Sequence, residues 1–254
     1  MSLNRKSLEH FFRENHKVAI ACSGGSDSTF LVHAATKIGA DVLPIIVRSR
    51  FERYDEIDAA IDFCHSEGLE PAVIDVDILS VQGMSDNGPD RCYICKRKMF
   101  EEIVGMANRR GYFVVADGTN ASDDREDRPG MRALEELGIR SPLREAGLTK
   151  SQIRRLSRSE RLSTWNKVSN SCLATRIAPG TPITEDLLIT IGKAEQCLEQ
   201  MGYSGFRVNT DGKDACIRMP QSMQANAKSR EVEIVAALSQ LFDKISIDEV
   251  TRDG

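Results

Sequence analysis

The chain has 254 residues, of which 41% are hydrophobic and 28% charged, and its formal net charge is −4. This length predicts one large or two modest domains, and the composition is typical of a globular protein. The mild acidic balance, without a long run of lysine and arginine, argues against nucleic acid as a partner. No apolar run has the length of a signal peptide or of a membrane span, so we expect a cytoplasmic protein without a membrane partner.

The first half of the chain alternates strand and helix patterns. Buried, strand-like runs are predicted at 18–22, 41–47, 71–76 and 112–116. Helical periodicity lies between them, at 29–38, 54–66 and 93–109. Strands separated by helices of this length predict a parallel, Rossmann-like α/β sheet, which binds its ligands at the carboxyl ends of the strands.

The second half begins with a polar region. Charged residues at 121–129 predict an exposed loop, and Thr149 is a good N-cap for the helix that follows it. Residues 165–182 lack periodicity and contain glycine and proline. We therefore place the domain boundary there, with a first domain at 1–165 and a second at 166–254.

The second domain is predicted to combine helices with short strands. One helix begins after Thr184. Two alternating strands, at 206–209 and 215–218, flank an Asp-Gly turn. A single long helix at 223–242 and a last segment at 245–250 complete a small α+β domain.

The segment between the first strand and the first helix carries the clearest functional signal. It is Ser23-Gly24-Gly25-Ser26-Asp27-Ser28. Glycines let a ligand approach the backbone, while N–H groups of the turn, the helix N-terminus and the serine hydroxyls donate to phosphate. The loop lacks the lysine of the Walker pattern and the glycine spacing of the dinucleotide fingerprint. It resembles the PP-loop of the ATP pyrophosphatase superfamily, whose adenine nucleotide alpha hydrolase-like domains transfer AMP to an acceptor and release pyrophosphate.

Further nucleotide contacts are expected at the same edge of the sheet, because the carboxyl ends of parallel strands meet there. Asp117 and Gly118 follow the fourth strand. Val47 and Arg48 end the second strand and, by analogy with other nucleotide-binding sheets, border the adenine.

Magnesium is expected as a cofactor together with ATP. This ion favours one or two carboxylates combined with phosphate oxygens and water. Asp27 in the loop is the candidate ligand, whereas we expect Asp123 and Asp124 of the polar region to face solvent.

Cys172 is the candidate nucleophile among seven cysteines, which in a reducing compartment are thiols, ligands or catalysts. It lies in the irregular segment, close in sequence to Lys167 and Arg176, and positive neighbours lower the pKa of a thiol. From the residues alone, a small buried hydrophobic role is equally compatible with this cysteine.

A more specific resemblance comes from several segments that occur in a fixed order. They are Asp90-Arg91-Cys92-Tyr93-Ile94-Cys95-Lys96, Asp117-Gly118-Thr119-Asn120, Arg128-Pro129-Gly130, Ser141-Pro142-Leu143 and Ser171-Cys172-Leu173-Ala174-Thr175-Arg176. Together with the PP-loop they resemble the LarE family of ATP-dependent sulfur transferases along nearly the whole chain.

That resemblance implies a substrate and a reaction. The small-molecule substrate of the family is pyridinium-3,5-biscarboxylic acid mononucleotide, a precursor of the nickel-pincer nucleotide cofactor. ATP adenylates a carboxylate of this nucleotide, and the thiolate of Cys172 attacks the acyl-adenylate. Cleavage of the bond between Cβ and sulfur then leaves a thiocarboxylate product and a dehydroalanine, so the enzyme is consumed.

The resemblance also implies substrate contacts and an assembly. Arg207 matches a strand that binds the substrate phosphate, and Arg176 is a second candidate, since a guanidinium suits bidentate phosphate contacts. Family members tend to have Arg-x-Arg on this strand, whereas the chain has Asn209 at the second position. Related proteins form homo-oligomers, and we expect one here.

Several roles stay open at the level of the sequence. Some family members use an iron–sulfur cluster held by three cysteines, and the C-x-x-C of Cys92 and Cys95 suits a helix cap, a metal site or a redox pair. Glu195 is a candidate for the base of the elimination only by its helix position, and a surface carboxylate is the simpler interpretation. A catalytic amide ligase similar to NAD synthetase, a tRNA thiolation enzyme and a nucleotide sensor without chemistry are the alternative functions.

Overall fold

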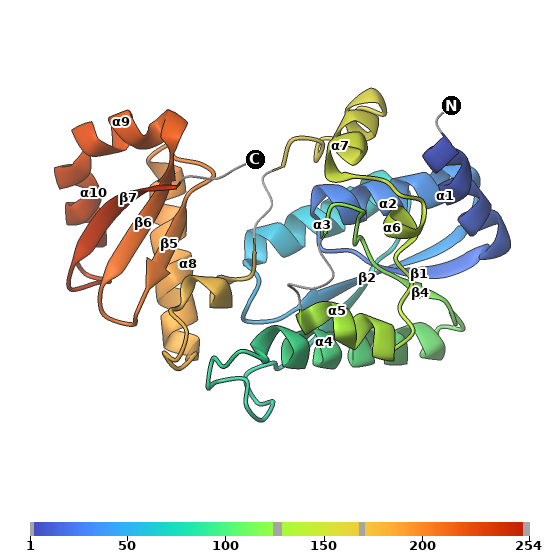
Figure 1. The fold of residues 1–254 in the computed structure, drawn as a ribbon, viewed down its shortest axis with the longest axis horizontal. Coiled ribbons are helices and arrows are strands. Elements are labelled where there is room, and N and C mark those ends of the chain that lie inside the picture. Colours follow the sequence, from blue (N-terminus) through green and yellow to red (C-terminus); the bar gives the residue numbers. More distant parts are fainter. Residues whose placement is uncertain (1–2, 124–128, 168–170, 251–254) are drawn as a thin grey trace. The chain divides into compact units, whose positions relative to one another are not determined.

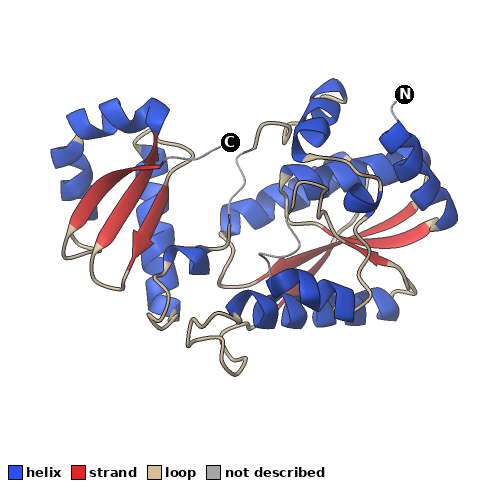
Figure 2. Ribbon diagram, viewed as in Figure 1, coloured by secondary structure: helices blue, strands red, loops and turns tan. Residues whose placement is uncertain are grey.

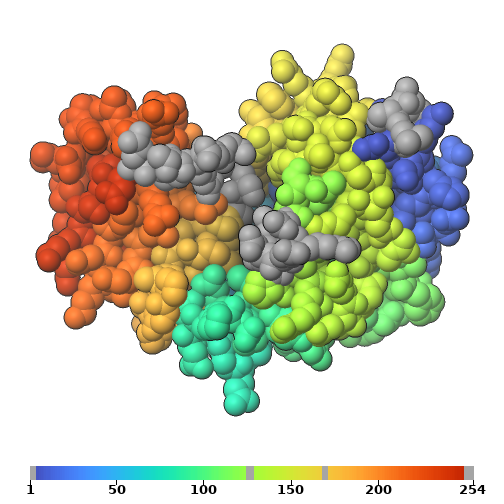
Figure 3. Space-filling view, viewed as in Figure 1, coloured from blue at the N-terminus to red at the C-terminus, as the bar shows by residue number. Residues whose placement is uncertain are grey.

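The computed structural model describes residues 3–123, 129–167 and 171–250, and grey marks the remaining residues in Figures 1 and 3. The chain forms two compact units, which are described separately. The first contains Met1–Val81 and Asp90–Asn170, and the second contains Gln82–Pro89 and Ser171–Gly254. The sequence pattern did not indicate that Gln82–Pro89, a short segment from the first half of the chain, belongs to the second unit.

The first unit is built on a four-stranded parallel sheet (Figure 2). Its strands are β1 (Lys17–Ala21), β2 (Asp41–Arg48), β3 (Ala72–Asp75) and β4 (Val115–Ala116). Their spatial order is β3-β2-β1-β4, and every neighbouring pair is parallel. The predicted Rossmann-like α/β class is confirmed, and the loops that follow β1 and β4 leave the sheet side by side.

Helices cover both faces of this sheet (Figure 1). One layer contains α1 (Leu3–Glu14), α2 (Ser26–Ile38), α3 (Tyr54–Ser66), α6 (Pro142–Glu145) and α7 (Lys150–Ser159). The other contains α4 (Arg91–Arg109) and α5 (Pro129–Glu136). Helix α3 spans the predicted range, and its buried residues are Ile57, Ala60, Phe63 and Cys64.

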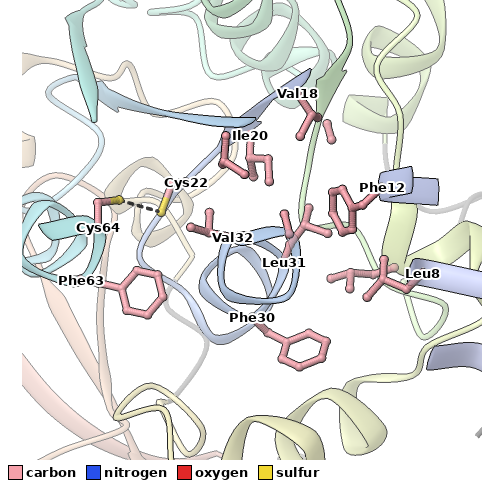
Figure 4. Close-up of a cluster of buried hydrophobic side chains, with 14 of the residues drawn as sticks. Leu8, Phe12, Val18, Ile20, Cys22, Phe30, Leu31, Val32, Phe63 and Cys64 are labelled. Carbon is pink, nitrogen blue, oxygen red and sulfur yellow. Dashed lines mark hydrogen bonds between the residues drawn. The ribbon is translucent and has the colours of Figure 1, made fainter. Parts of the chain in front are cut away.

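A hydrophobic core fixes α2 against the sheet (Figure 4). β1 contributes Val18 and Ile20, α2 contributes Leu31 and Val32, and α1 contributes Phe12, all without exposed surface. Burying a side chain of this size contributes about 1.5–3 kcal/mol. This packing therefore sets the position of the loop at the N-terminus of α2.

The second unit has a three-stranded mixed sheet in the order β5-β6-β7. Strand β5 (Arg207–Thr210) is antiparallel to β6 (Ala215–Pro220), and β7 (Ile245–Val250) is parallel to β6. Its helices are the 3-10 turn η1 (Leu173–Arg176), α8 (Glu185–Gln200), α9 (Gln221–Ser229) and α10 (Glu231–Leu238). Apolar residues of α8, α9, α10 and one face of the sheet form a separate core.

Hydrogen bonds explain why Gln82–Pro89 belongs to the second unit. The buried Asn87 donates from Nδ2 to the carbonyl oxygens of Ala178 (2.8 Å) and Thr181 (3.0 Å). The carbonyl of Ser85 accepts from the N–H of Ile183 (2.8 Å). A segment this short gains its structure from such contacts rather than from its own periodicity.

Two predicted elements differ from the structure. The single helix predicted at 223–242 is wrong, because Arg230 leaves the helical conformation (φ −111°, ψ 19°) and separates α9 from α10. The strand predicted at 112–116 is shorter, since the N–H of Tyr112 binds the carbonyl of Ala107 at the end of α4.

The described ranges set limits on two predictions, one on single residues and one on membrane spans. Asp124, which was expected to face solvent, and Arg128 of the Arg128-Pro129-Gly130 motif lie outside the described residues. Across 3–123, 129–167 and 171–250, no helix combines the length and apolar character of a membrane span.

Candidate functional site

The glycine-serine loop forms the N-terminus of α2. The helix begins at Ser26, with Gly25 as its extended N-cap (φ −76°, ψ 162°). It was predicted to begin at residue 29, so Asp27 and Ser28 lie in its first turn and not, as predicted, in the loop before it. The first N–H groups of a helix have no acceptor within the helix and lie at the positive end of its dipole. This turn therefore presents donors that suit an anion.

Hydroxyl groups hold the loop in one conformation. Ser28 Oγ donates to the carbonyl of Gly25 (3.2 Å) and accepts from the N–H of Ser23 (3.2 Å). The hydroxyl oxygens of Ser23 and Ser28 are also 3.2 Å apart. Thr29 Oγ1 donates to the same Gly25 carbonyl (2.9 Å). The side chains of the loop thus close the turn by their own hydrogen bonds.

Two glycines lie where a larger residue does not fit. Gly24 has a φ of +70°, and a Cβ at this position would lie 2.9 Å from the Cβ of Ala60 on α3. A Cβ at Gly118 would lie 2.9 Å from the backbone nitrogen of Ser28. The loop after β4 thus contacts the first turn of α2, as expected from the strand order.

A lysine from a distant helix contacts this turn. Lys150, the first residue of α7, places its Nζ 2.6 Å from Asp27 Oδ2 and 3.0 Å from Ser26 Oγ. Asn120 Nδ2 donates to the same Asp27 oxygen (3.2 Å). The loop therefore acquires the ammonium group that its own sequence lacks.

Sequence reasoning missed this lysine because it sought one within the loop. A second ammonium, that of Lys167, donates to the carbonyl of Gly24 (3.1 Å). The available signal for Lys150 was Thr149, whose predicted capping role is confirmed by a capping box with Gln152. The cap predicts that Lys150 begins a helix. Only the three-dimensional fold brings that helix next to the loop.

Two carboxylates shape the loop after β4: Asp117 of the predicted site, and Asp123, which was expected to face solvent but is half-buried. The buried Asp117 accepts from Ser141 Oγ (2.7 Å) and from Thr119 Oγ1. Asp123 Oδ2 accepts from the backbone N–H of Asn120 (3.0 Å). These hydrogen bonds order the loop that carries the Asn120 amide.

The carboxyl end of β2 lies beside the strand that carries the loop. Val47 is half-buried there, and Arg48 makes two hydrogen bonds to Asp75, from Nε to Oδ1 (2.5 Å) and from Nη2 to Oδ2 (2.9 Å). The hydrogen bond from the guanidinium lowers the pKa of Asp75. That Val47 and Arg48 border an adenine stays a prediction.

Two thiols lie in the core next to the loop (Figure 4). The sulfur of Cys64 donates to that of Cys22, the residue directly before the loop, over 3.9 Å. This hydrogen bond lowers the pKa of Cys22 and raises that of Cys64, and burial adds to the increase at Cys64. The pair is part of the packing that supports the loop.

Cys172 lies in the second unit, immediately before η1. Its side chain is half-buried. Its carbonyl oxygen accepts from both the N–H (3.0 Å) and the Oγ1 (2.7 Å) of Thr175. The backbone at this cysteine is therefore held by the turn that follows it.

A buried ion pair supports the same turn. Arg176 is 2% exposed and Glu195 3% exposed, with Arg176 Nε 2.7 Å from Glu195 Oε1. Arg176 Nη1 also donates to the hydroxyls of Ser171 (2.6 Å) and Thr175 (3.0 Å). The guanidinium thus holds residues on both sides of Cys172.

This placement changes the interpretation of both charged residues. The prediction that Arg176 contacts a substrate phosphate does not fit a guanidinium that is enclosed and already paired with a carboxylate. The surface carboxylate expected at Glu195 is wrong, because the side chain is buried.

Arg207 and Asn209 lie on β5, whose alternate residues Val208 and Thr210 are buried. The strand runs beside the segment that follows η1, where the N–H of Ala178 donates to the carbonyl of Thr210 (2.8 Å). The segment of the candidate nucleophile and the strand of the predicted phosphate ligand are therefore neighbours within one unit.

Cys92 and Cys95 lie in the first turns of α4. Cys92 is exposed, and Cys95 Sγ is 3.5 Å from Met99 Sδ. In the part of the chain that the structure describes, no three side chains of His, Cys, Asp or Glu are grouped to hold a metal ion. The helix-cap, metal and redox roles of this pair stay predictions.

The parallel sheet and the loop between β1 and α2 define the first unit as a Rossmann-like PP-loop domain. No protein-family model matches the chain. It is 32% identical over 249 residues to an uncharacterised protein of Synechocystis, covering 98% of this chain and 92% of that protein.

Two other relatives match most of the chain. One is the pyridinium-3,5-bisthiocarboxylic acid mononucleotide synthase of Lactiplantibacillus plantarum, 29% identical over 224 residues, with 87% of this chain and 81% of the synthase covered. The other is an uncharacterised protein of Methanocaldococcus jannaschii, 29% identical over 244 residues, with 96% and 93% covered. The chain belongs to the LarE family.

Proposed function

We propose that the protein is an AMP-forming sulfur transferase. It adenylates a carboxylate of pyridinium-3,5-biscarboxylic acid mononucleotide and transfers the sulfur of its own Cys172, in biosynthesis of the nickel-pincer cofactor. The observation that carries the proposal is the half-buried Cys172, whose neighbours Ser171 and Thr175 are held by the buried Arg176–Glu195 pair, in a chain that also has a phosphate-binding loop. The similarity to the L. plantarum synthase supports the choice of substrate.

The first unit provides the adenylation site. Phosphate oxygens accept from the first turn of α2 and from the serine hydroxyls. The Lys150 side chain is 28% exposed, so a triphosphate can replace Asp27 as the partner of its ammonium group. The substrate carboxylate attacks the α-phosphorus, the bond to the bridging oxygen breaks, and pyrophosphate leaves with the electron pair. Lys150 and the helix dipole stabilise that negative charge.

Magnesium fits the loop as an ion that arrives with the nucleotide. Asp27 offers one carboxylate beside the first turn of α2, and its Oδ1 makes only a 3.5 Å contact with Ser26 Oγ. Mg²⁺ combines one or two carboxylates with phosphate oxygens and water. Bound there, the ion would neutralise phosphate charge. Asp27 would hold it once Lys150 has turned to the phosphates.

The second unit provides the sulfur. The thiolate of Cys172 attacks the acyl carbon, a thioester forms, and AMP leaves. A base then removes the proton from Cα of the same residue, the electron pair forms the Cα–Cβ double bond, and the Cβ–S bond breaks. The sulfur leaves with the acyl group as a thiocarboxylate, and dehydroalanine remains in the chain.

Intact-protein mass spectrometry tests this proposal. After incubation with ATP, Mg²⁺ and the mononucleotide, the protein should lose the mass of one H₂S, and the loss should map to the peptide with Cys172. Cys197→Ala is the matched control, since this half-buried cysteine on α8 has no part in the proposed reaction and the variant should lose the same mass. Thiocarboxylate formed while Cys172 stays intact would contradict the proposal.

A further inference from the structure

Two cysteines of the first unit lie next to the phosphate-binding loop and have no part in the proposed reaction. Cys22 is the last residue before the loop, and Cys64 lies on α3. Both are free thiols, and their sulfur atoms point toward each other at a distance of 3.9 Å (Figure 4). A disulfide bond requires two cysteines whose side chains converge in this way. The pair is therefore placed for oxidation to a disulfide.

The two thiols differ in reactivity. The hydrogen bond from Cys64, together with one from the backbone N–H of Gly24, lowers the pKa of Cys22. The same contact between the thiols raises the pKa of Cys64. Cys22 keeps 2% of its surface exposed and Cys64 none. Because the thiolate is the form that reacts with oxidants, Cys22 is the thiol that is oxidised first, and Cys64 is the one that reacts with the product.

Helix α3 connects this pair to the conformation of the loop. Ala60 lies one turn before Cys64, and a Cβ at Gly24 would lie only 2.9 Å from the Cβ of Ala60. Cys22 is fixed to the sheet, since its N–H donates to the carbonyl of Ile45 on β2 (2.9 Å). An S–S bond is about 2.0 Å long, so its formation draws α3 toward the end of β1. No space is free between Ala60 and Gly24, and the loop must shift.

A shift at Gly24 reaches the phosphate-binding groups directly. The carbonyl of Gly24 accepts from the Lys167 ammonium (3.1 Å). The next carbonyl, that of Gly25, accepts from the hydroxyls of Ser28 (3.2 Å) and Thr29 (2.9 Å). These hydrogen bonds set the direction of the N–H groups at the N-terminus of α2. A displaced loop would lose the matched donors that a phosphate needs.

We propose that hydrogen peroxide converts Cys22 and Cys64 into a reversible disulfide, and that this bond weakens ATP binding at the adjacent loop. The Cys22 thiolate attacks one peroxide oxygen, the O–O bond breaks, and the other oxygen leaves as hydroxide and takes up a proton. The sulfur of Cys64 then attacks that of the sulfenic acid, and the hydroxyl group leaves with the Cys64 proton as water. Two thiols are oxidised, and one peroxide is reduced to two waters. The effect on ATP rests on the proposed function, because it regulates the proposed adenylation site.

Peptide mapping by mass spectrometry tests for the bond without any assay of activity. After treatment with hydrogen peroxide and blocking of the remaining thiols, the peptides that contain Cys22 and Cys64 should be joined to each other. Dithiothreitol should separate them. If these two cysteines stay reduced while the exposed Cys92 is oxidised, the disulfide site is overturned.

Calorimetric titration with ATP and Mg²⁺, without the mononucleotide, tests the effect on the loop. Oxidation of the unmodified chain should weaken ATP binding by about 10- to 100-fold, the range for one hydrogen bond to a charged group. Dithiothreitol should restore it. Cys64→Ser nearly preserves the side-chain volume and cannot form the bond, so its ATP affinity should be equal before and after peroxide. Cys95→Ala, which removes the other closely spaced pair of cysteines, should stay sensitive. Equal affinities for the reduced chain and the mapped disulfide form overturn the effect on ATP.

Thermodynamic linkage provides an independent measurement. If the disulfide weakens ATP binding, ATP must favour the reduced pair by the same factor. A 10-fold difference in affinity corresponds to a reduction potential about 30 mV higher in saturating ATP, measured by mapping the disulfide in glutathione buffers. An unchanged potential overturns the coupling. A reduced chain that binds no ATP contradicts the proposed function instead, and peptide mapping still decides whether the disulfide forms.

Discussion

Each unit contains a charged pair next to its candidate site, and the two pairs differ in burial. In the first unit, the side chains of Lys150 and Asp27 are 28% and 18% exposed. In the second, those of Arg176 and Glu195 are 2% and 5% exposed. A partly exposed pair is weak, so a charged ligand can take one partner. A buried pair must stay matched, because a buried charge without its partner is strongly destabilising. The first pair is therefore suited to exchange partners during a reaction, and the second to hold the backbone around a nucleophile.

The largest effect is expected when the nucleophile itself is removed. Cys172→Ala should abolish thiocarboxylate formation, because no sulfur is left to transfer. Pyrophosphate release should continue for about one equivalent, since adenylation depends only on the first unit. Separate assays of pyrophosphate and thiocarboxylate check this, with Cys197→Ala as the variant that keeps both. Many turnovers by Cys172→Ala with ammonia as acceptor would instead favour the amide ligase.

The buried pair should give the largest effect on stability. Glu195→Ala leaves the Arg176 guanidinium enclosed without its carboxylate, and the free energy of unfolding should fall by about 3–5 kcal/mol. Urea denaturation followed by circular dichroism measures this change. Glu233→Ala is the matched control, because it breaks an exposed pair with Arg230 in the same unit.

Two outcomes sharpen the contrast between the units. A double variant, Arg176→Met with Glu195→Leu, should recover much of the stability lost in Glu195→Ala, since an apolar pair of similar volume replaces the charges. Equal unfolding curves for Glu195→Ala and Glu233→Ala would show that the enclosed pair has no structural role, and the comparison between the units would lose its basis.

The features of the site that could be predicted from the sequence are those set by residues close together in the chain. The strand before the loop, the glycines at 24 and 25 and the helix after them follow from side-chain periodicity and backbone freedom within about 20 residues. The contact between Lys150 and Asp27 joins residues 123 positions apart, so no local pattern encodes it. No local pattern indicates that residues 82–89 belong to the second unit either, because their contacts are with residues about 90 positions later in the chain. The burial of Glu195 was missed because a carboxylate in a helical pattern is normally exposed, and its partner lies on another element.

The partly exposed pair should affect chemistry more than stability. Lys150→Ala removes the ammonium that neutralises the leaving pyrophosphate, and the rate of adenylation should fall on the order of 100-fold. Isotope exchange between pyrophosphate and ATP in the presence of the substrate measures this step. Lys37→Ala is the control, because Lys37 lies in the last turn of the same helix, α2, and pairs with Glu160. A rate for Lys150→Ala equal to that of Lys37→Ala would contradict the role of Lys150.

A third ion pair, Arg48 with Asp75, extends the comparison to an exposed pair and should give the smallest effect. The side chains are 43% and 73% exposed, and a pair in that environment contributes little to stability. The guanidinium lowers the pKa of Asp75, so any stabilisation is present above the unfolded pKa and is lost as the pH falls through the folded value. Asp75→Asn should therefore match the unmodified chain in melting temperature in acid and differ slightly near neutral pH. If Arg48 borders the adenine, releasing it should change the KM for ATP in the pyrophosphate exchange assay and leave the maximal exchange rate unchanged. A fall in the maximal exchange rate as large as that of Lys150→Ala would mean that the end of β2 acts on the reacting phosphates. Burial would then not distinguish the ion pairs that exchange partners from those that do not.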